Sequence, residues 1–227
     1  MKKYFDKLNS YSDTTAEHND IQQLLEVEEK YQIKIPEVFK DFYEYYSNNP
    51  TIMNGYANFY KLEDLKILEN GNIIFADEYN RWNSYTSLKL DNNSIVRINR
   101  YDNVEDITSE IMGIEENYSS LFLDINDFML FSVAYSTVLS MPLKVSYTLP
   151  MDFEFDEIYL TSFFDNNFKI NKIFLYKDIL CVYSSLSETL MFGIKTDEEM
   201  EEVKKYLQKL YDDIYLKGFN DQNVFVK

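Results

Sequence analysis

Side chains that could perform nucleophilic or metal-dependent chemistry are scarce in this chain. Its 227 residues include one histidine, His18, and one cysteine, Cys181, which lie far apart in the sequence. A Ser–His or Cys–His nucleophile pair has only His18 to use, and a transition-metal site needs several histidine or cysteine ligands. The five scattered glycines do not form a phosphate-binding loop. We therefore expect a protein that is not an enzyme and has no cofactor and no metal site.

Carboxylates are the remaining candidates for catalysis, because 39 Asp and Glu residues make close pairs possible in any fold. Two groups stand out, Asp77 with Glu78, and Asp152 with Glu154 and Asp156. In a strand, the three acids of the second group would lie on one face and the phenylalanines between them on the other. This pattern fits a hydrolase or calcium site, but we favour a solvated face over a buried one.

Negative charge is concentrated in one third of the chain. The formal net charge is −17, and residues 101–168 contain thirteen acids against one base, Lys144, so they contribute −12. Nucleic acid and anionic membranes are disfavoured as partners, because both are bound through clustered Lys and Arg. A basic protein would be attracted to this region. Alternatively, the acids only keep an aromatic-rich chain soluble.

The composition predicts a folded protein that stays in the cytoplasm. The chain is 45% hydrophobic, with 20 Tyr and 17 Phe but only 5 Gly and 4 Pro. No apolar run approaches the roughly 18 residues of a transmembrane helix, and the first residues turn polar before a signal-peptide region could form. Cys181 cannot form an internal disulfide, and its apolar surroundings indicate a packing role.

Periodicity predicts helices and a sheet in the first 142 residues. One helix is expected from about residue 15 to 31, capped by Thr14 or Thr15, and a second should begin at Pro36. Strands are expected at 58–62, 73–76, 84–90 and 94–98 as an antiparallel meander, before a helix that starts near 124–126 and ends near 140. The second helix should bury one aromatic stripe: Phe39, Phe42, Tyr43 and Tyr46.

The second part of the chain, residues 143–227, begins again with strands. They are expected at 170–176, 179–184 and 190–194, with a tight turn at 177–178. Thr196 and Glu199 form a capping box for a last helix over residues 197–217. Its apolar seam comprises Met200, Val203, Leu207, Leu210 and Ile214.

The order of these elements predicts an α+β fold with an antiparallel or mixed sheet, helices packed against it, and C-terminal strands that end in an amphipathic helix. We expect the regions 1–142 and 143–227 to pack into one globular unit.

Several runs in the first part resemble a known family. Residues 21–43 join two helices through Ile35-Pro36 and carry an aromatic pattern in the second helix. Residues 59–65, 73–82 and 119–130 follow in the family's order. Together they resemble the SMI1/KNR4 (SUKH) family over residues 15–140. Two departures are residues 48–50, where the family usually has a glycine, and the chain after 140, which has no counterpart.

The resemblance implies an α+β fold and, for bacterial members, an immunity protein that neutralises a partner toxin. Our leading hypothesis is a non-catalytic protein that binds a basic, nucleic-acid-targeting toxin, and the acidic bias agrees with it. A regulatory or scaffolding protein, as the family's eukaryotic members imply, is the alternative. A carboxylate-dependent hydrolase is the third hypothesis.

The expected binding surface combines aromatic anchors with acidic residues. Trp82, the only tryptophan, follows Asp77, Glu78 and Tyr79 in a segment expected to be a loop. Interfaces favour aromatic anchors, while complementary charge mainly speeds association. We predict Tyr79 and Trp82 as anchors. The predicted acidic rim comprises Glu105, Asp106, Glu115 and Glu116. In the alternative interpretation, Trp82 lies in the core and the acids contact nothing.

Overall fold

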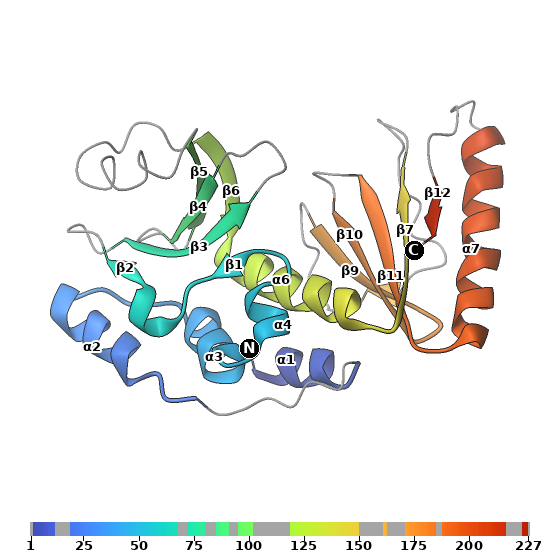
Figure 1. The fold of residues 1–227 in the computed structure, drawn as a ribbon. Coiled ribbons are helices and arrows are strands. Elements are labelled where there is room, and N and C mark those ends of the chain that lie inside the picture. Colours follow the sequence, from blue (N-terminus) through green and yellow to red (C-terminus); the bar gives the residue numbers. More distant parts are fainter. Residues whose placement is uncertain are drawn as a thin grey trace. The chain divides into compact units, whose positions relative to one another are not determined.

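The fold consists of two compact units, each built from helices and an antiparallel sheet (Figure 1). A computed structural model describes residues 2–11, 19–67, 72–79, 85–90, 95–101, 119–149, 161–162, 171–184, 188–216 and 224–226. The units are Met1–Val133 and Ala134–Lys227, and their boundary falls inside helix α6 (Ile125–Ser140) rather than at residue 142. The predicted α+β fold is confirmed. That the two parts form one globular unit stays a prediction.

The first unit begins with four helices. They are α1 (Lys2–Asn9), α2 (Gln22–Tyr31), α3 (Glu37–Tyr46) and α4 (Pro50–Met53). Helix α1 was not predicted. The predicted start of α2 at residue 15 was wrong, because residues 19–21 are not helical. Instead, the Asp20 carboxylate accepts a hydrogen bond from the Gln22 amide at 2.8 Å, which occupies one of the free amides at the helix start. Thr14 and Thr15 lie outside the described residues.

Helix α3 supplies the aromatic stripe that the sequence predicted. It starts after Pro36, and the side chains of Phe39, Phe42, Tyr43 and Tyr46 are all 0% exposed. The Tyr43 hydroxyl donates a hydrogen bond to the carbonyl of Tyr60 at 3.0 Å, so its burial leaves no orphaned donor. This burial also raises the pKa of Tyr43 well above its ordinary value.

The sheet of the first unit is an antiparallel meander in the order β1-β3-β4-β5-β6, with β2 also paired to β3. Its strands are β1 (Asn58–Phe59), β2 (Lys66–Ile67), β3 (Ile73–Tyr79), β4 (Tyr85–Leu90), β5 (Ile95–Tyr101) and β6 (Ser119–Asp124). A 3-10 turn, η1 (Leu62–Asp64), lies between β1 and β2. The predicted meander is confirmed, while β6 was not expected as a strand.

The core of the first unit is largely aromatic. Phe75 lies where the pairing of β3 with β4 shifts by one residue. Its ring centroid is 5.4 Å from that of Phe39 on α3 and 5.8 Å from that of Phe128 on α6. Figure 1 shows α3 and the start of α6 on the same side of this sheet. One face of the sheet is therefore packed against helices.

The second unit has a sheet in the order β12-β7-β11-β10-β9-β8, again antiparallel at every pairing. The strands are β7 (Leu143–Thr148), β8 (Thr161–Ser162), β9 (Asn171–Tyr176), β10 (Ile179–Ser184), β11 (Thr189–Ile194) and β12 (Val224–Val226). The predicted tight turn joins β9 to β10, with Lys177 and Asp178 at φ of 48° and 67°. Positive φ at both positions is typical of a type I′ hairpin.

Helix α7 (Asp197–Leu216) packs on this sheet and is capped as predicted. The Glu199 amide donates to Thr196 Oγ1 at 3.2 Å, and the Lys195 amide donates to the Glu199 carboxylate at 2.6 Å. From the predicted seam, Val203, Leu207 and Leu210 are buried and Met200 is half-buried, and the side chain of Ile214 is not described. The seam also includes Tyr206, which was missed and which packs 5.6 Å from Phe192 of β11, measured between ring centroids.

Candidate functional site

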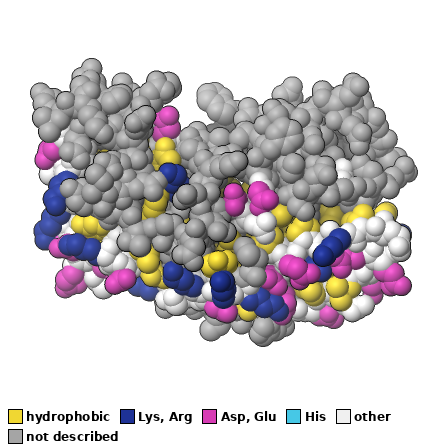
Figure 2. Space-filling view, turned by 180° about the vertical axis from the view of Figure 1, so that it is seen from behind, with side chains coloured by type: hydrophobic (Ala, Val, Ile, Leu, Met, Phe, Trp, Pro, Cys, Tyr) yellow, Lys and Arg dark blue, Asp and Glu magenta, His cyan; other side chains and the backbone are white. Residues whose placement is uncertain are grey.

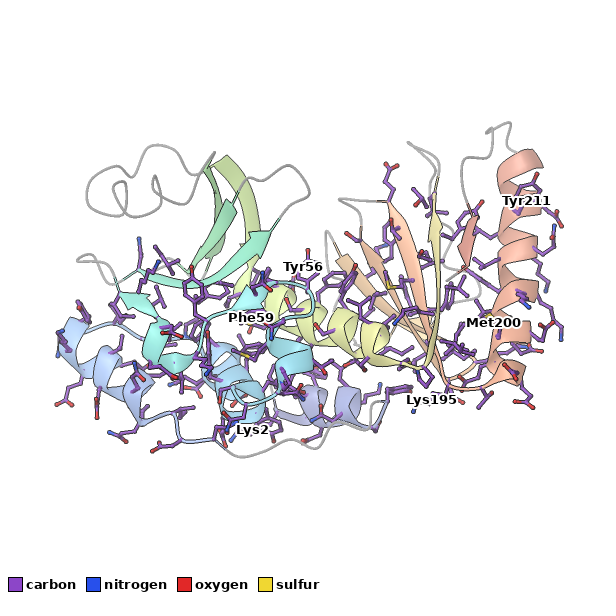
Figure 3. All side chains as sticks on the ribbon, in the orientation of Figure 1. Lys2, Tyr56, Phe59, Lys195, Met200 and Tyr211 are labelled. Carbon is purple, nitrogen blue, oxygen red and sulfur yellow. The ribbon has the colours of Figure 1, made fainter. Side chains whose placement is uncertain are left out.

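The two faces of the first sheet are distinguished by the short strand β1. Phe59 is 6% exposed, and its ring centroid lies 4.5 Å from that of Phe42 on α3, whereas its neighbour Asn58 is exposed (Figure 3). Phe59 pairs with Ala76 of β3, and Asn58 pairs with Asp77. Because directly paired residues lie on the same face of a sheet, Asp77 belongs to the face opposite the helices.

A row of polar residues crosses four strands on this second face. Asp77 of β3 pairs with Ser87 of β4, which pairs with Asn99 of β5. With Asn58 of β1 they form a continuous line of paired positions, which we call the polar row. Every member can form hydrogen bonds.

A row of three tyrosines lies two positions further along the same strands. Tyr79 of β3 pairs with Tyr85 of β4, and Tyr85 pairs with Tyr101 of β5. Residues two apart in a strand lie on one face, so this tyrosine row shares its face with the polar row. The structure thus brings together three aromatic residues that are separated by up to 22 positions in the sequence.

Charged residues are distributed unevenly along this face, with an acid near the tyrosine row and two bases farther from it. Asp77 is two positions from Tyr79 along β3, or roughly 7 Å. At the other end of the strands, Lys89 of β4 pairs with Arg97 of β5. These two bases are four positions from the tyrosine row, about 13 Å away. Among the described strand positions of this face, the acid is therefore the charged residue nearest to the tyrosines.

The predicted site residues are only partly described. The expectation of a loop was wrong for residues 77–79, which belong to strand β3. Tyr79 and Asp77 lie on the face just defined, but Glu78 belongs to the opposite face, where it pairs with Thr86. Asp77 and Glu78 are therefore separated by the sheet, which argues against a catalytic carboxylate pair at this point. The other predicted residues lie outside the described part of the chain, and their roles stay predictions: Trp82, Glu105, Asp106, Glu115 and Glu116. The same holds for His18 and for the acids at 152, 154 and 156.

Sequence analysis missed Tyr85 and Tyr101 as members of the site. A signal for them exists, because the β4–β5 hairpin is symmetric about residue 93, with Leu90 paired to Val96 and Tyr85 to Tyr101. The polar residues at 91–93 marked that loop. Counting outward from its centre would have placed the two tyrosines opposite each other.

Other candidate chemistry finds no support in the described residues. No group of three or more His, Cys, Asp or Glu side chains in these ranges is placed to hold a metal ion. Cys181 is 0% exposed, and its burial raises the pKa of the thiol well above 9.0. The predicted packing role of Cys181 is confirmed.

Surface charge is mixed in the described part of the molecule. Figure 2 shows lysine side chains interspersed with Asp and Glu side chains across the described surface of that view. Several exposed lysines are paired with acids, such as Lys2 with Glu44 at 2.8 Å and Lys204 with Glu201 at 2.7 Å. The concentrated negative charge therefore belongs to residues 101–168, and most of the acids in this range lie outside the described residues.

Comparison with models of known families, with curated proteins and with solved structures found no match for this chain. The resemblance to SMI1/KNR4 thus rests on the order and spacing of residues in the sequence. None of the helices in the described ranges combines the length and the apolar character needed to cross a membrane.

Proposed function

We propose that this chain is a non-catalytic binding protein that neutralises a basic bacterial toxin. It would cover the toxin with the face of the first sheet that carries the polar row and the tyrosine row. The tyrosine row beside the polar row is the observation that carries the proposal. Tyrosine offers a large, rigid contact with one polar end, and Ser and Asn offer adaptable hydrogen bonds. This combination of residue types is characteristic of protein surfaces that recognise other proteins.

Charge supports a basic partner. The chain carries −17 in total, and six acids lie within residues 102–118, which directly follow Tyr101 at the end of β5. A field of this sign attracts a basic protein and raises its association rate. Toxins that act on nucleic acid need basic surfaces to bind phosphates, so covering such a surface would block their substrate.

The test begins with the protein encoded next to this chain's gene. If it is the toxin, its expression alone should arrest growth, co-expression of this chain should restore growth, and the two proteins should co-purify. Absence of both rescue and complex would refute neutralisation. Rescue without a complex would also refute it, because the proposal requires direct binding.

Charge reversal then locates the steering region. Lysine at positions 105, 106, 115 and 116 should slow association at least ten-fold at low salt and flatten its salt dependence, with little change in melting temperature. The matched control reverses four acids that are exposed on α2 and η1: Glu26, Glu29, Glu63 and Asp64. It changes the net charge equally. Equal slowing by both variants would show that overall charge, and not this region, steers the partner.

A further inference from the structure

We infer that the tyrosine row binds the guanidinium group of an arginine from the partner protein, with Asp77 as its counter-ion. The inference rests on the proposed function, because it names the chemical group that the binding face recognises. It follows from three features of the described strands: the pairing of the tyrosines, the position of the acid and the position of the two bases.

The spacing of the row suits a planar cation. Neighbouring strands lie about 4.8 Å apart, so three directly paired tyrosines span about 10 Å across the sheet. The face of an aromatic ring is electron-rich and attracts cations, and arginine does this more often than lysine. The guanidinium is flat and weakly hydrated, so it can lie against a ring while its N–H groups bond sideways. Each tyrosine of the row is a candidate for this contact.

The charges favour one cation at one end of the face. Asp77 lies roughly 7 Å along the strand from the tyrosine row, within the reach of a long arginine side chain, and a carboxylate can accept two of its N–H bonds. Lys89 and Arg97 lie opposite each other about 13 Å from the row, and Asp124 pairs with Ile95, two positions beyond Arg97 on the same face. Asp77 is therefore the acid nearest to the tyrosines, and the partner should present an arginine over this end of the face.

A direct test needs no knowledge of the partner. The probes are N-acetyl-arginine amide, the lysine analogue, and the citrulline analogue, which has nearly the shape of arginine without its charge. The protein is labelled with 3-fluorotyrosine, and the signals of positions 79, 85 and 101 are assigned from single Tyr→Phe variants. The arginine probe should shift these signals saturably. The lysine probe should bind about three-fold more weakly and the citrulline probe at least three-fold more weakly.

Substitutions test whether the arginine probe contacts the ring face of a tyrosine or its hydroxyl group. Tyr85→Leu should weaken binding of the arginine probe three- to five-fold, while Tyr85→Phe should leave it within two-fold, because the ring face is retained. Asp77→Asn should weaken it about two-fold. Tyr31→Leu, which removes a half-buried tyrosine at the end of α2, is the matched control and should change nothing. The unshifted fluorotyrosine signals report whether each variant is folded. If Tyr85→Leu does not fold, Asp77→Asn is the variant that tests the inference.

Equal affinity for the arginine and citrulline probes would overturn the inference and would indicate an uncharged ligand. Binding that survives both Tyr85→Leu and Asp77→Asn would also overturn it. Failure of the proposed function looks different. If the neighbouring protein forms no complex but the arginine probe binds as described, the site exists and toxin neutralisation is wrong. If the complex forms but is insensitive to Tyr85→Leu, neutralisation uses another surface.

Discussion

Replacing Phe59 with alanine should destabilise the first unit far more than the same change at Asn58. Phe59 is 6% exposed, and its ring centroid lies 4.5 Å from that of Phe42 and 6.1 Å from those of Phe75 and Phe128. Removing a buried phenylalanine costs about 3–5 kcal/mol, because apolar contacts are lost and a cavity remains. Asn58→Ala changes an exposed position and should alter the free energy of unfolding by at most about 0.5 kcal/mol.

The comparison can be measured by urea unfolding. Far-ultraviolet circular dichroism follows the unfolding of the whole chain, and both variants are compared with wild type under the same conditions. With a urea dependence of about 2 kcal/mol/M for a small unit, a loss of about 4 kcal/mol moves the midpoint down by about 2 M. Such a loss is a large share of the stability of a typical domain.

The result bears on the binding face as well as on stability. The assignment of Asp77 to the face opposite the helices starts from the contrast between exposed Asn58 and buried Phe59. A midpoint shift below about 0.5 M for Phe59→Ala, or comparable shifts for the two variants, would refute that assignment and with it the placing of the tyrosine row.

Three further predictions concern the second unit. Thr196→Ala should destabilise it by about 1 kcal/mol in a thermal or urea melt, because the Glu199 amide loses its acceptor. Glu202 has a pKa lowered to about 2 from an ordinary 4.5, because Lys177 and Lys205 donate hydrogen bonds to it. Its contribution to stability is therefore present above about pH 4.5 and is lost as the pH falls toward 2. In urea melts, the free energy of unfolding should fall more steeply between pH 4.5 and 2 in wild type than in the Glu202→Gln variant, and the difference between the two proteins should disappear near pH 2. Cys181 should not react with a thiol reagent in the native protein and should react fully in denaturant, and rapid native labelling would contradict its burial.

Much of the fold could be predicted because the signals were local. Proline fixed the start of α3, a capping box marked α7, and the polar residues 91–93 marked a hairpin loop. The elements that were missed depend on distant partners. Strand β6 has only a short apolar run of its own and pairs with β5, and β12 is three residues long and pairs with β7, some 77 positions earlier at Tyr147. Such short segments carry too few residues to show a period.

The site was predictable in part for the same reason. Tyr79 and Asp77 were selected from a contiguous segment, and the structure places them on one face of the sheet. Tyr101 belongs to their row only because two hairpins bring β5 to the correct register. Sequence periodicity assigns residues to faces within a strand, but the register between strands decides which of them become neighbours. Glu78 is adjacent to Asp77 in sequence but lies on the other face of the sheet, because successive residues of a strand alternate between its two faces.

The turn between β9 and β10 has a consequence for how the second unit folds. Lys177 and Asp178 both adopt positive φ, a conformation that Asn-Gly would adopt at lower cost. The local sequence therefore opposes the turn, and the hairpin should close only once apolar residues of the two strands, such as Phe174 and its partner Cys181, have met. Replacing the pair by Asn-Gly would then slow unfolding with little effect on the folding rate. If folding accelerated by the full gain in stability, the turn would be formed in the transition state and would direct the assembly of the sheet.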